Sequence, residues 1–159
     1  MKKLKLYFDT SVISHLFAED ALAKKEDTLQ LWREAIKGKF DVYLSPTVMD
    51  ELSDCPEPKL GKMLAELDKI EYTMVELSDD VARLAQAYRD NAVLPKGSIN
   101  DSLHIACAVI QDCDLIVSWN FKHMANERTN NGVKIVNTMN NYKEIRIIIP
   151  SNIIENPKA

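Results

Sequence analysis

Short apolar runs alternate along this chain with longer segments whose apolar residues recur at helical spacing. The first run, Leu4–Phe8, alternates and then becomes fully apolar, which is typical of a strand that enters a buried sheet. The longer segments show one apolar face, for example at positions i, i+3, i+4 and i+7 counted from Val81, after the helix-capping residue Ser78. Strands that alternate with helices predict an α/β domain with a mainly parallel central sheet between layers of helices.

Turn and cap residues divide the chain into a series of expected elements. Pro46 suits the first position of a helix, and Gly38 ends the preceding one. Besides the first run, strands are predicted at residues 41–45, 72–77, 114–118, 133–136 and 145–149. Helices are predicted at residues 11–17, 27–37, 46–52, 59–69, 78–88, 98–111 and 120–127. The tail at 156–159 is expected to be frayed, and because no linker or repeat interrupts the chain we expect a single domain over residues 1–159.

The composition is that of an ordinary soluble globular protein. The 159 residues suffice for one domain with a substantial core, and hydrophobic residues make up 46% and charged residues 28% of them. With 4 glycines and neither a G-x-x-x-x-G-K nor a G-x-G-x-x-G motif, the sequence offers no glycine-rich loop that cradles phosphate. The net charge of −4 provides no global basic field for nucleic acid, but it is compatible with an enzyme whose metal ions neutralise phosphate locally.

Cysteine content and hydropathy bear on the cellular compartment. The 3 cysteines are odd in number and form no C-x-x-C motif, which favours free thiols in a reducing cytoplasm. The N-terminus passes directly from Met-Lys-Lys into a predicted strand, and no stretch approaches membrane-spanning length. We therefore expect a cytoplasmic protein with no membrane partner.

Three acidic residues stand where a predicted buried segment gives way to a turn or a helix. Asp9 directly follows the first strand, Glu51 lies about one helical turn beyond the end of the second, and Asp101 lies in the first turn of a helix. Active groups of an open α/β sheet gather at the carboxyl ends of its strands, so we expect these carboxylates to meet. Their repulsion would then be offset by a bound cation, and such hard oxygen ligands suit Mg²⁺ or Mn²⁺. The leading idea is a metal-dependent reaction on phosphate.

Each acid also has a simpler structural interpretation. Asp9 is suited to cap the helix that follows it, and Asp101 is suited to form a capping box with Ser98. Glu51 is also interpretable as a solvated helix residue, with Asp50 beside it as a competing candidate. Each pattern is weak by itself, and only the joint arrangement favours a site.

Four ordered motifs carry a resemblance to a known family. They are LYFDTS at residues 6–11, SPTVMDEL at 45–52, NDSLHIACA at 100–108 and LIVSWNFKH at 115–123. This set resembles the PIN-domain family, particularly small single-domain members similar to the VapC toxins of bacterial toxin–antitoxin pairs. The resemblance covers essentially the whole chain and implies a three-layer α/β/α fold with an acidic, Mg²⁺- or Mn²⁺-dependent ribonuclease site.

The resemblance also implies roles for individual residues. Asp9, Glu51 and Asp101 match the metal-binding acids of the family, and Thr10 or Ser11 would support the first acid or a bound water. In the toxin relatives a small antitoxin inserts a segment near the site, and homodimers are common. An antitoxin protein and a second copy of the chain are therefore candidate partners besides an RNA substrate.

The chain departs from the family pattern at Asn120. The family often has an aspartate there, two residues after a Ser or Thr that in this chain is Ser118. An amide oxygen can still bind a hard cation or hold its water, but it carries no charge, so the resemblance leaves one or two metal ions open. By itself, Asn120 is also a candidate helix cap.

Other side chains near the motifs are further candidates. His104 follows Asp101 by three residues and shares a helix face with it, so it is a candidate to orient that carboxylate or to transfer a proton, with simple packing as the alternative. Four cations are candidates for contact with RNA phosphates, with ordinary surface charge as the alternative: Lys96, Lys122, His123 and Arg128.

The leading functional hypothesis is a metal-dependent endoribonuclease, the toxin-type member of a toxin–antitoxin pair, that hydrolyses RNA through a metal-activated water. The alternative is a catalytically weak or inactive PIN-like module that binds RNA or protein, since Asn120 removes one charge from the site. A phosphatase built on Asp9 is a weaker idea, because Thr10 and Ser11 replace its usual Asp-x-Asp start.

Overall fold

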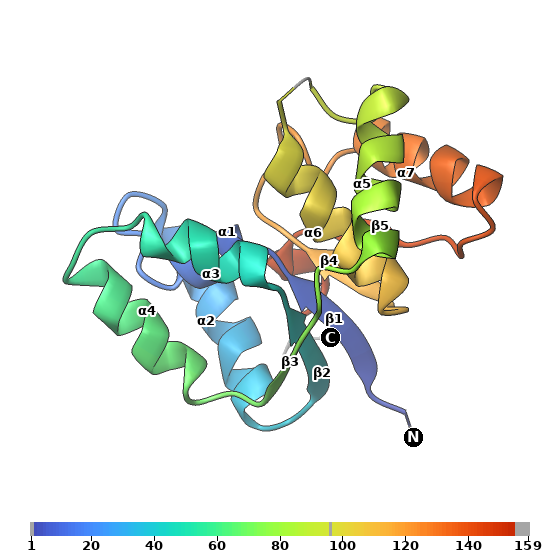
Figure 1. Cartoon of the computed structure of the whole chain (residues 1–159). Coiled ribbons are helices and arrows are strands. Elements are labelled where there is room, and N and C mark those ends of the chain that lie inside the picture. The colour runs from blue at the N-terminus through green and yellow to red at the C-terminus, as the bar shows by residue number, and fades with distance from the viewer. Residues whose placement is uncertain (1, 96, 155–159) are drawn as a thin grey trace.

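The computed structural model of the chain describes residues 2–95 and 97–154, and a five-stranded sheet forms its centre. The strand order is β3–β2–β1–β4–β5, and the pairings among these strands are all parallel (Figure 1). The central strand β1 (Leu4–Phe8) lies between β2 (Phe40–Leu44) and β4 (Leu115–Val117), and β3 (Tyr72–Met74) and β5 (Arg146–Ile148) form the two edges. The predicted parallel sheet is therefore confirmed.

Strand β1 is the buried axis of the fold. Its Leu6 is level with Val42 of β2 on one side and with Leu115 of β4 on the other. Leu6, Tyr7 and Phe8 are fully buried, which explains why the first apolar run loses its alternation toward its end. The next residue along the chain therefore emerges at the carboxyl edge of the sheet.

Helices cover both faces of the sheet. They are α1 (Thr10–His15), α2 (Leu22–Ile36), α3 (Pro46–Ser53), α4 (Lys59–Leu67), α5 (Asp79–Asp90), α6 (Ile99–Ile110) and α7 (Glu127–Met139), followed by the short 3-10 helix η1 (Pro150–Asn152). Right-handed crossovers between parallel strands place the first four helices on one face and α5 to α7 on the other, and Figure 1 shows these two groups on opposite sides. The fold is the predicted three-layer α/β/α arrangement.

Local signals in the sequence set several element boundaries. Ser78 caps α5 by accepting a hydrogen bond from the backbone N–H of Val81, and Pro46 occupies the first turn of α3. Gly38 follows the end of α2 with a positive φ of 78°, as a helix-ending glycine should. The start of α2 differs from the prediction, since the helix begins at Leu22 rather than at residue 27.

The helix predicted at residues 120–127 is wrong. Residues 121–124 form turns, and the helix that follows begins only at Glu127. Asn126 sets this start, because its side-chain oxygen accepts a hydrogen bond from the backbone N–H of Thr129. The cap of this helix is therefore Asn126, not Asn120.

The strand predicted at residues 133–136 is also wrong, because α7 spans it. Val133 and Val136 are three residues apart and buried on the helix face that packs into the core, whereas Ile135 points outward and is 60% exposed. A run of four residues fits either the helical or the strand period, and here the flanking helix decides.

Two of the predictions concern residues that lie outside the described ranges, namely Lys96 and the tail at 156–159. Within the described ranges, no helix combines the length and apolar character needed to cross a membrane. Cys55, Cys107 and Cys113 are free thiols, as their odd number predicted.

Candidate active site

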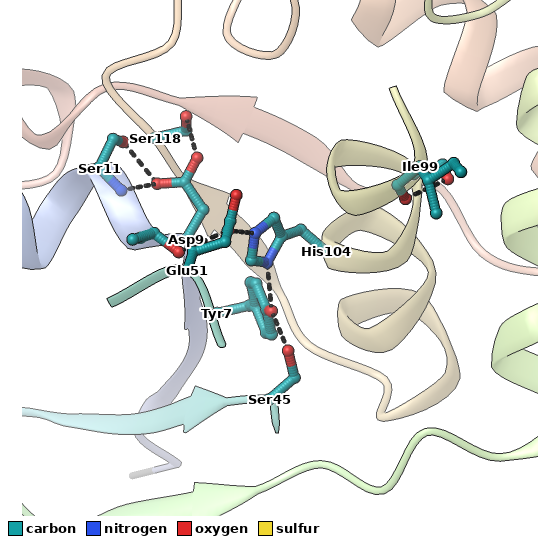
Figure 2. A network of polar contacts seen from close by, with 10 residues as sticks. Tyr7, Asp9, Ser11, Ser45, Glu51, Ile99, His104 and Ser118 are labelled. Atoms are coloured by element: carbon teal, nitrogen blue, oxygen red, sulfur yellow. Dashed lines mark hydrogen bonds and ion pairs between the residues drawn. The ribbon is translucent and has the colours of Figure 1, made fainter. Parts of the chain in front are cut away.

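Asp9 leaves the carboxyl end of β1 and is held by two serines (Figure 2). Its Oδ1 accepts hydrogen bonds from the backbone N–H of Ser11 at 3.1 Å and from the Ser11 hydroxyl at 2.5 Å, and its Oδ2 accepts one from the Ser118 hydroxyl. The side chain is therefore the cap of α1, as the simpler interpretation held. It is also only 4% exposed and fixed between the ends of β1 and β4.

Glu51 reaches the same region from α3. Its Oε1 accepts a hydrogen bond from the Thr10 hydroxyl at 2.6 Å and lies 2.6 Å from Nε2 of His104. Burial, the largest effect, raises the pKa of Glu51, but the bond and charge of His104 together with the bond from Thr10 outweigh it, so the pKa lies below its usual value. Asp50, the competing candidate, is exposed on the same helix.

A buried chain of hydrogen bonds continues behind Glu51 (Figure 2). Nδ1 of His104 lies 2.6 Å from the Tyr7 hydroxyl oxygen, which lies 2.7 Å from the Ser45 hydroxyl oxygen. An ionised Glu51 can only accept, so Nε2–H of His104 donates to it, and Nδ1 on the other side of the ring bonds to the Tyr7 hydroxyl. The hydrogen bond of His104 therefore goes to Glu51 and not to its predicted partner, Asp101.

Asp101 lies half-buried in the first turn of α6. With Glu51 it lines an open hollow of about 390 Å³, whose other walls come from residues 97–100. Ser98 occupies the cap position of α6, but its hydroxyl makes no cap hydrogen bond, so the predicted capping box is wrong. The carboxylate of Asp101 instead belongs to the wall of the hollow.

The three acids lie in one region, because Asp101 and Glu51 line the same hollow and Glu51 bonds to Thr10, the residue after Asp9. Burial raises the pKa of Asp101 most, and the charges of Asp9 and Glu51 raise it further, while His104 and His123 oppose them. Negative charges that raise the pKa of a neighbouring carboxyl group mark a place where a cation would be stabilised.

Asp9 shows the same pattern. Burial raises its pKa most and the charge of Glu51 adds to the rise, whereas His104 and the hydrogen bonds from Ser11 and Ser118 oppose it. Two of the three acids are thus held under conditions that disfavour their ionised form.

Asn120 lies at the rim of this cluster. Its backbone N–H donates to the Ser118 hydroxyl at 3.0 Å, and that hydroxyl in turn donates to Asp9. Its side-chain Oδ1 accepts from the backbone N–H of His123 at 3.0 Å and so stabilises the turn after β4. Sequence position and hydrogen bonding place Asn120 next to the acids, with its oxygen engaged in a local bond.

The donor set fits a hard divalent cation in its chemistry. It consists of the carboxylates of Asp9, Glu51 and Asp101 with the amide of Asn120, all oxygen ligands of the kind that Mg²⁺ and Mn²⁺ prefer. Across residues 2–95 and 97–154, no group of three or more His, Cys, Asp or Glu side chains is arranged so that it could hold a metal ion by itself. Mg²⁺ commonly takes one or two carboxylates directly and completes its shell with water, so an open set is compatible with it.

The sequence did not single out Tyr7 or Ser45 as parts of the site. Both are fully buried polar groups, and a buried hydroxyl needs a partner, which is the available signal for Tyr7 in an otherwise apolar strand. The family resemblance implies that Thr10 or Ser11 supports Asp9 or a bound water. Ser11 does so, whereas Thr10 supports Glu51.

Fold and site together define an α/β/α domain with an acidic cluster at the carboxyl edge of a parallel sheet. A family model described as PIN domain matches residues 5–122, which include the three acids and Asn120. The chain therefore belongs to the PIN-domain family, as its four motifs predicted, and PIN domains are generally nucleases.

The fold also resembles that of a solved structure. One chain in the crystal structure of VapBC2 from Rickettsia felis bound to a DNA fragment from their promoter matches with a TM-score of 0.55, over 92% of this chain and 98% of that chain. The two sequences are 13% identical, so the likeness shows the shared fold. A sequence comparison with curated proteins gives no significant match.

Proposed function

We propose that residues 1–159 form a single PIN domain that acts as a Mg²⁺- or Mn²⁺-dependent endoribonuclease. The observation that carries the proposal is the placement of Asp9, Glu51 and Asp101 at the carboxyl edge of the sheet, where Glu51 bonds to Thr10 beside Asp9 and lines one hollow with Asp101. The charges of Asp9 and Glu51 raise the pKa of Asp101, and a divalent cation would stabilise its ionised form. The open hollow beside Asp101 leaves room for a phosphodiester.

The side chains around the acids would fix the site before substrate binds. Asp9, Glu51 and Asp101 would hold the ion, with Asn120 at the edge of its shell. A bound Mg²⁺ or Mn²⁺ would supply an activated water and offset the charge that develops on the scissile phosphate. The expected products carry a 5′-phosphate and a 3′-hydroxyl.

Neighbouring hydroxyl and imidazole groups would keep the acids in one orientation. Ser11 and Ser118 donate to the two oxygens of Asp9 and so fix its carboxylate plane. Thr10 and His104 donate to one oxygen of Glu51, and a hydrogen bond with Asn100 also acts on this carboxylate. Such preorganisation reduces the reorganisation that the reaction requires.

Cleavage of a fluorescent single-stranded RNA in Mn²⁺ tests the proposal. We expect Asp101→Asn and Glu51→Gln to lower the rate by at least about a hundredfold, since each removes a charge that holds the ion. The matched control is Asp50→Asn, an exposed acid next to Glu51, which should cleave like the wild type. Undiminished cleavage by Asp101→Asn and Asp9→Asn would contradict the assignment.

We further propose that the chain is the toxin-type member of a toxin–antitoxin pair in the cytoplasm, with an antitoxin protein as partner and a second copy in a homodimer. The fold shared with VapBC2 supports this proposal. Induced expression should arrest growth, and Asp101→Asn should relieve the arrest at equal protein level. Light scattering of the purified chain measures its oligomeric state.

Asn120 favours a second candidate function, a PIN-like module that binds RNA or protein without cleaving. The residue carries no charge, and its side-chain oxygen already bonds to His123. Calorimetry separates the candidates, because an enzyme should bind Mn²⁺ at or below millimolar concentration. Intact RNA binding without any Mn²⁺ binding would favour the module.

A further inference from the structure

Two cationic side chains and an imidazole line a second open hollow, of about 340 Å³. Lys122 and His123 come from the turn after β4, and Arg128 comes from the first turn of α7. The connection after α5, including Leu94 and Pro95, forms an apolar wall. No carboxylate is among the described residues that line it, although the whole chain has a net charge of −4. The hollow is therefore locally positive, whereas the chain as a whole is negative.

The cations of this hollow are available to a ligand. Lys122 and Arg128 are exposed, and neither forms an ion pair with a described residue. The nearest acid along the chain, Glu127, is engaged by Arg146, whose Nη2 lies 2.8 Å from its Oε1. An anion would thus meet unneutralised positive charge there.

The turn that carries Lys122 and His123 is held at both ends. The backbone N–H of His123 donates to Asn120 Oδ1 at 3.0 Å, and its carbonyl accepts from the Thr129 hydroxyl at 2.9 Å. Asn126 joins this turn to α7, because its side-chain oxygen accepts from Thr129 N–H at 2.8 Å and its amide donates to the carbonyl of residue 121. The cationic wall is therefore preorganised.

A close approach of α7 to the opposite wall shapes the hollow. A Cβ atom added to Gly132 would lie 3.0 Å from Cγ1 of Val93, so the absence of a side chain lets the helix pack against the connection after α5. This packing holds the first turn of α7, with Arg128, opposite Leu94.

The hollow adjoins the acidic cluster. Hydrogen bonds join the turn to the cluster, because Asn120 bonds to both His123 and Ser118, and Ser118 bonds to Asp9. A polyanion bound across the acids would extend into this hollow and meet its cations.

We propose that this hollow is a subsite for a backbone phosphate of RNA that neighbours the scissile phosphate. Lys122, His123 and Arg128 would contact that phosphate, and the apolar wall at Leu94 and Pro95 would exclude water beside it. Arginine matches the geometry of phosphate oxygens and lysine acts as a point charge, so the pair fixes register without reading sequence. The proposal rests on the proposed function, because it takes RNA as the substrate.

Salt-dependent binding of a fluorescent single-stranded RNA, measured by anisotropy in EDTA, tests the subsite without cleavage. We expect Lys122→Ala and Arg128→Ala each to weaken binding about tenfold at low salt. Each should also reduce the slope of log K against log salt by about 0.7, the value expected when the protein neutralises one phosphate fewer on a single strand. In Mn²⁺, KM should rise with kcat changed by less than about twofold, because the removed interaction binds substrate and transition state equally.

Lys3→Ala and Lys37→Ala are matched controls, since both lysines are exposed and line a hollow at the amino ends of β2 and β3. These two variants should bind RNA like the wild type. An unchanged slope for Lys122→Ala and Arg128→Ala, an equal weakening in the controls, or a wild type that binds no RNA would overturn the subsite. A wild type that shows the expected binding pattern but never cleaves would instead overturn the proposed nuclease and keep the subsite.

Discussion

His104 Nε2 lies 2.6 Å from Glu51 Oε1, so a buried ring on α6 holds a carboxylate on α3 across 53 positions of sequence. His104 is 1% exposed, and both of its ring nitrogens are hydrogen-bonded. Tyr7 fixes the far side of the ring, which makes the orientation of Glu51 dependent on a tyrosine in the central strand.

Tyr7→Phe should lower the cleavage rate without weakening substrate binding. The change keeps the ring in the core but removes the hydroxyl that bonds His104 and Ser45, so the imidazole loses its fixed orientation. We expect kcat to fall about tenfold with KM changed by less than twofold, a split that indicates a loss in the transition state. Steady-state kinetics in Mn²⁺ measure both, and the unfolding free energy should fall by about 1–2 kcal/mol.

The matched control for this variant is Tyr88→Phe. Tyr88 is also fully buried, and its hydroxyl donates to Asn137 Oδ1 at 2.5 Å, away from the acids. The same atom is removed, so a comparable loss of stability is expected with kcat unchanged. An equal loss of kcat in both variants would show that Tyr7 acts only through stability.

Asp101→Asn should stabilise the metal-free protein at neutral pH. The folded-state pKa of Asp101 is raised by burial and by the charges of Asp9 and Glu51, so its stabilising contribution is present below the unfolded-state pKa and is lost as pH rises through the folded-state pKa. The variant should therefore melt on the order of 2 °C higher than the wild type at pH 7, a small shift because water screens a half-buried group. The difference should vanish near pH 3.

Thermal melts with Mn²⁺ complete this comparison. A ligand that binds the folded state raises its melting temperature, so Mn²⁺ should stabilise the wild type and have little effect on Asp101→Asn. A variant that melts below the wild type at pH 7 would contradict the electrostatic interpretation of Asp101.

Asn120→Asp should strengthen metal binding. An aspartate keeps the oxygen that accepts from His123 N–H, so the turn survives, and it adds a fourth carboxylate beside Asp9. We expect the Kd for Mn²⁺ to fall by roughly five- to tenfold in calorimetry, about 1 kcal/mol, because the Coulomb gain is offset by repulsion among the acids. Asn131→Asp, on the exposed side of α7, is the control, and equal Kd values for the two variants would disprove the role of position 120.

Gly132→Ala should destabilise the protein although alanine favours helices. The added Cβ would lie 3.0 Å from a methyl group of Val93, a buried and stiff side chain, and we expect the unfolding free energy to fall by about 1–2 kcal/mol. Chemical denaturation measures this change. Val93→Ala in the same chain should remove the clash, and the opposite outcome, with the single variant as stable as the wild type, would mean that α7 shifts freely.

The sequence predicted those features that depend on one strand end or one cap. Asp9 could be placed because the apolar run before it ends in a parallel strand, and Ser78 and Pro46 could be placed because each acts on its own helix. The sequence pattern wrongly predicts a strand at Val133 and Val136, because a run of four residues is too short to distinguish the helical period from the strand period.

The sequence did not predict the choice of partner for each polar group. His104 shares a helix face with Asp101, yet it bonds to Glu51, because α3 and α6 approach each other at the edge of the sheet. Ser45 and Tyr7 meet for a similar reason, since Ser45 follows the end of β2 and Tyr7 lies on the neighbouring strand β1, opposite Tyr43. Such choices depend on distances between elements, which no local pattern contains.

The strand order has a further consequence for the site. From β1 the chain crosses over one face toward β2, and from β4 it crosses over the other face toward β5, so the loops after these two adjacent strands diverge. A crevice must open at such a topological switch point, and Asp9 and Ser118 lie on its two sides. The path of the backbone creates this opening, so the position of the active site depends on the fold. A sequence with this fold can therefore diverge widely and still keep its acids at the same position.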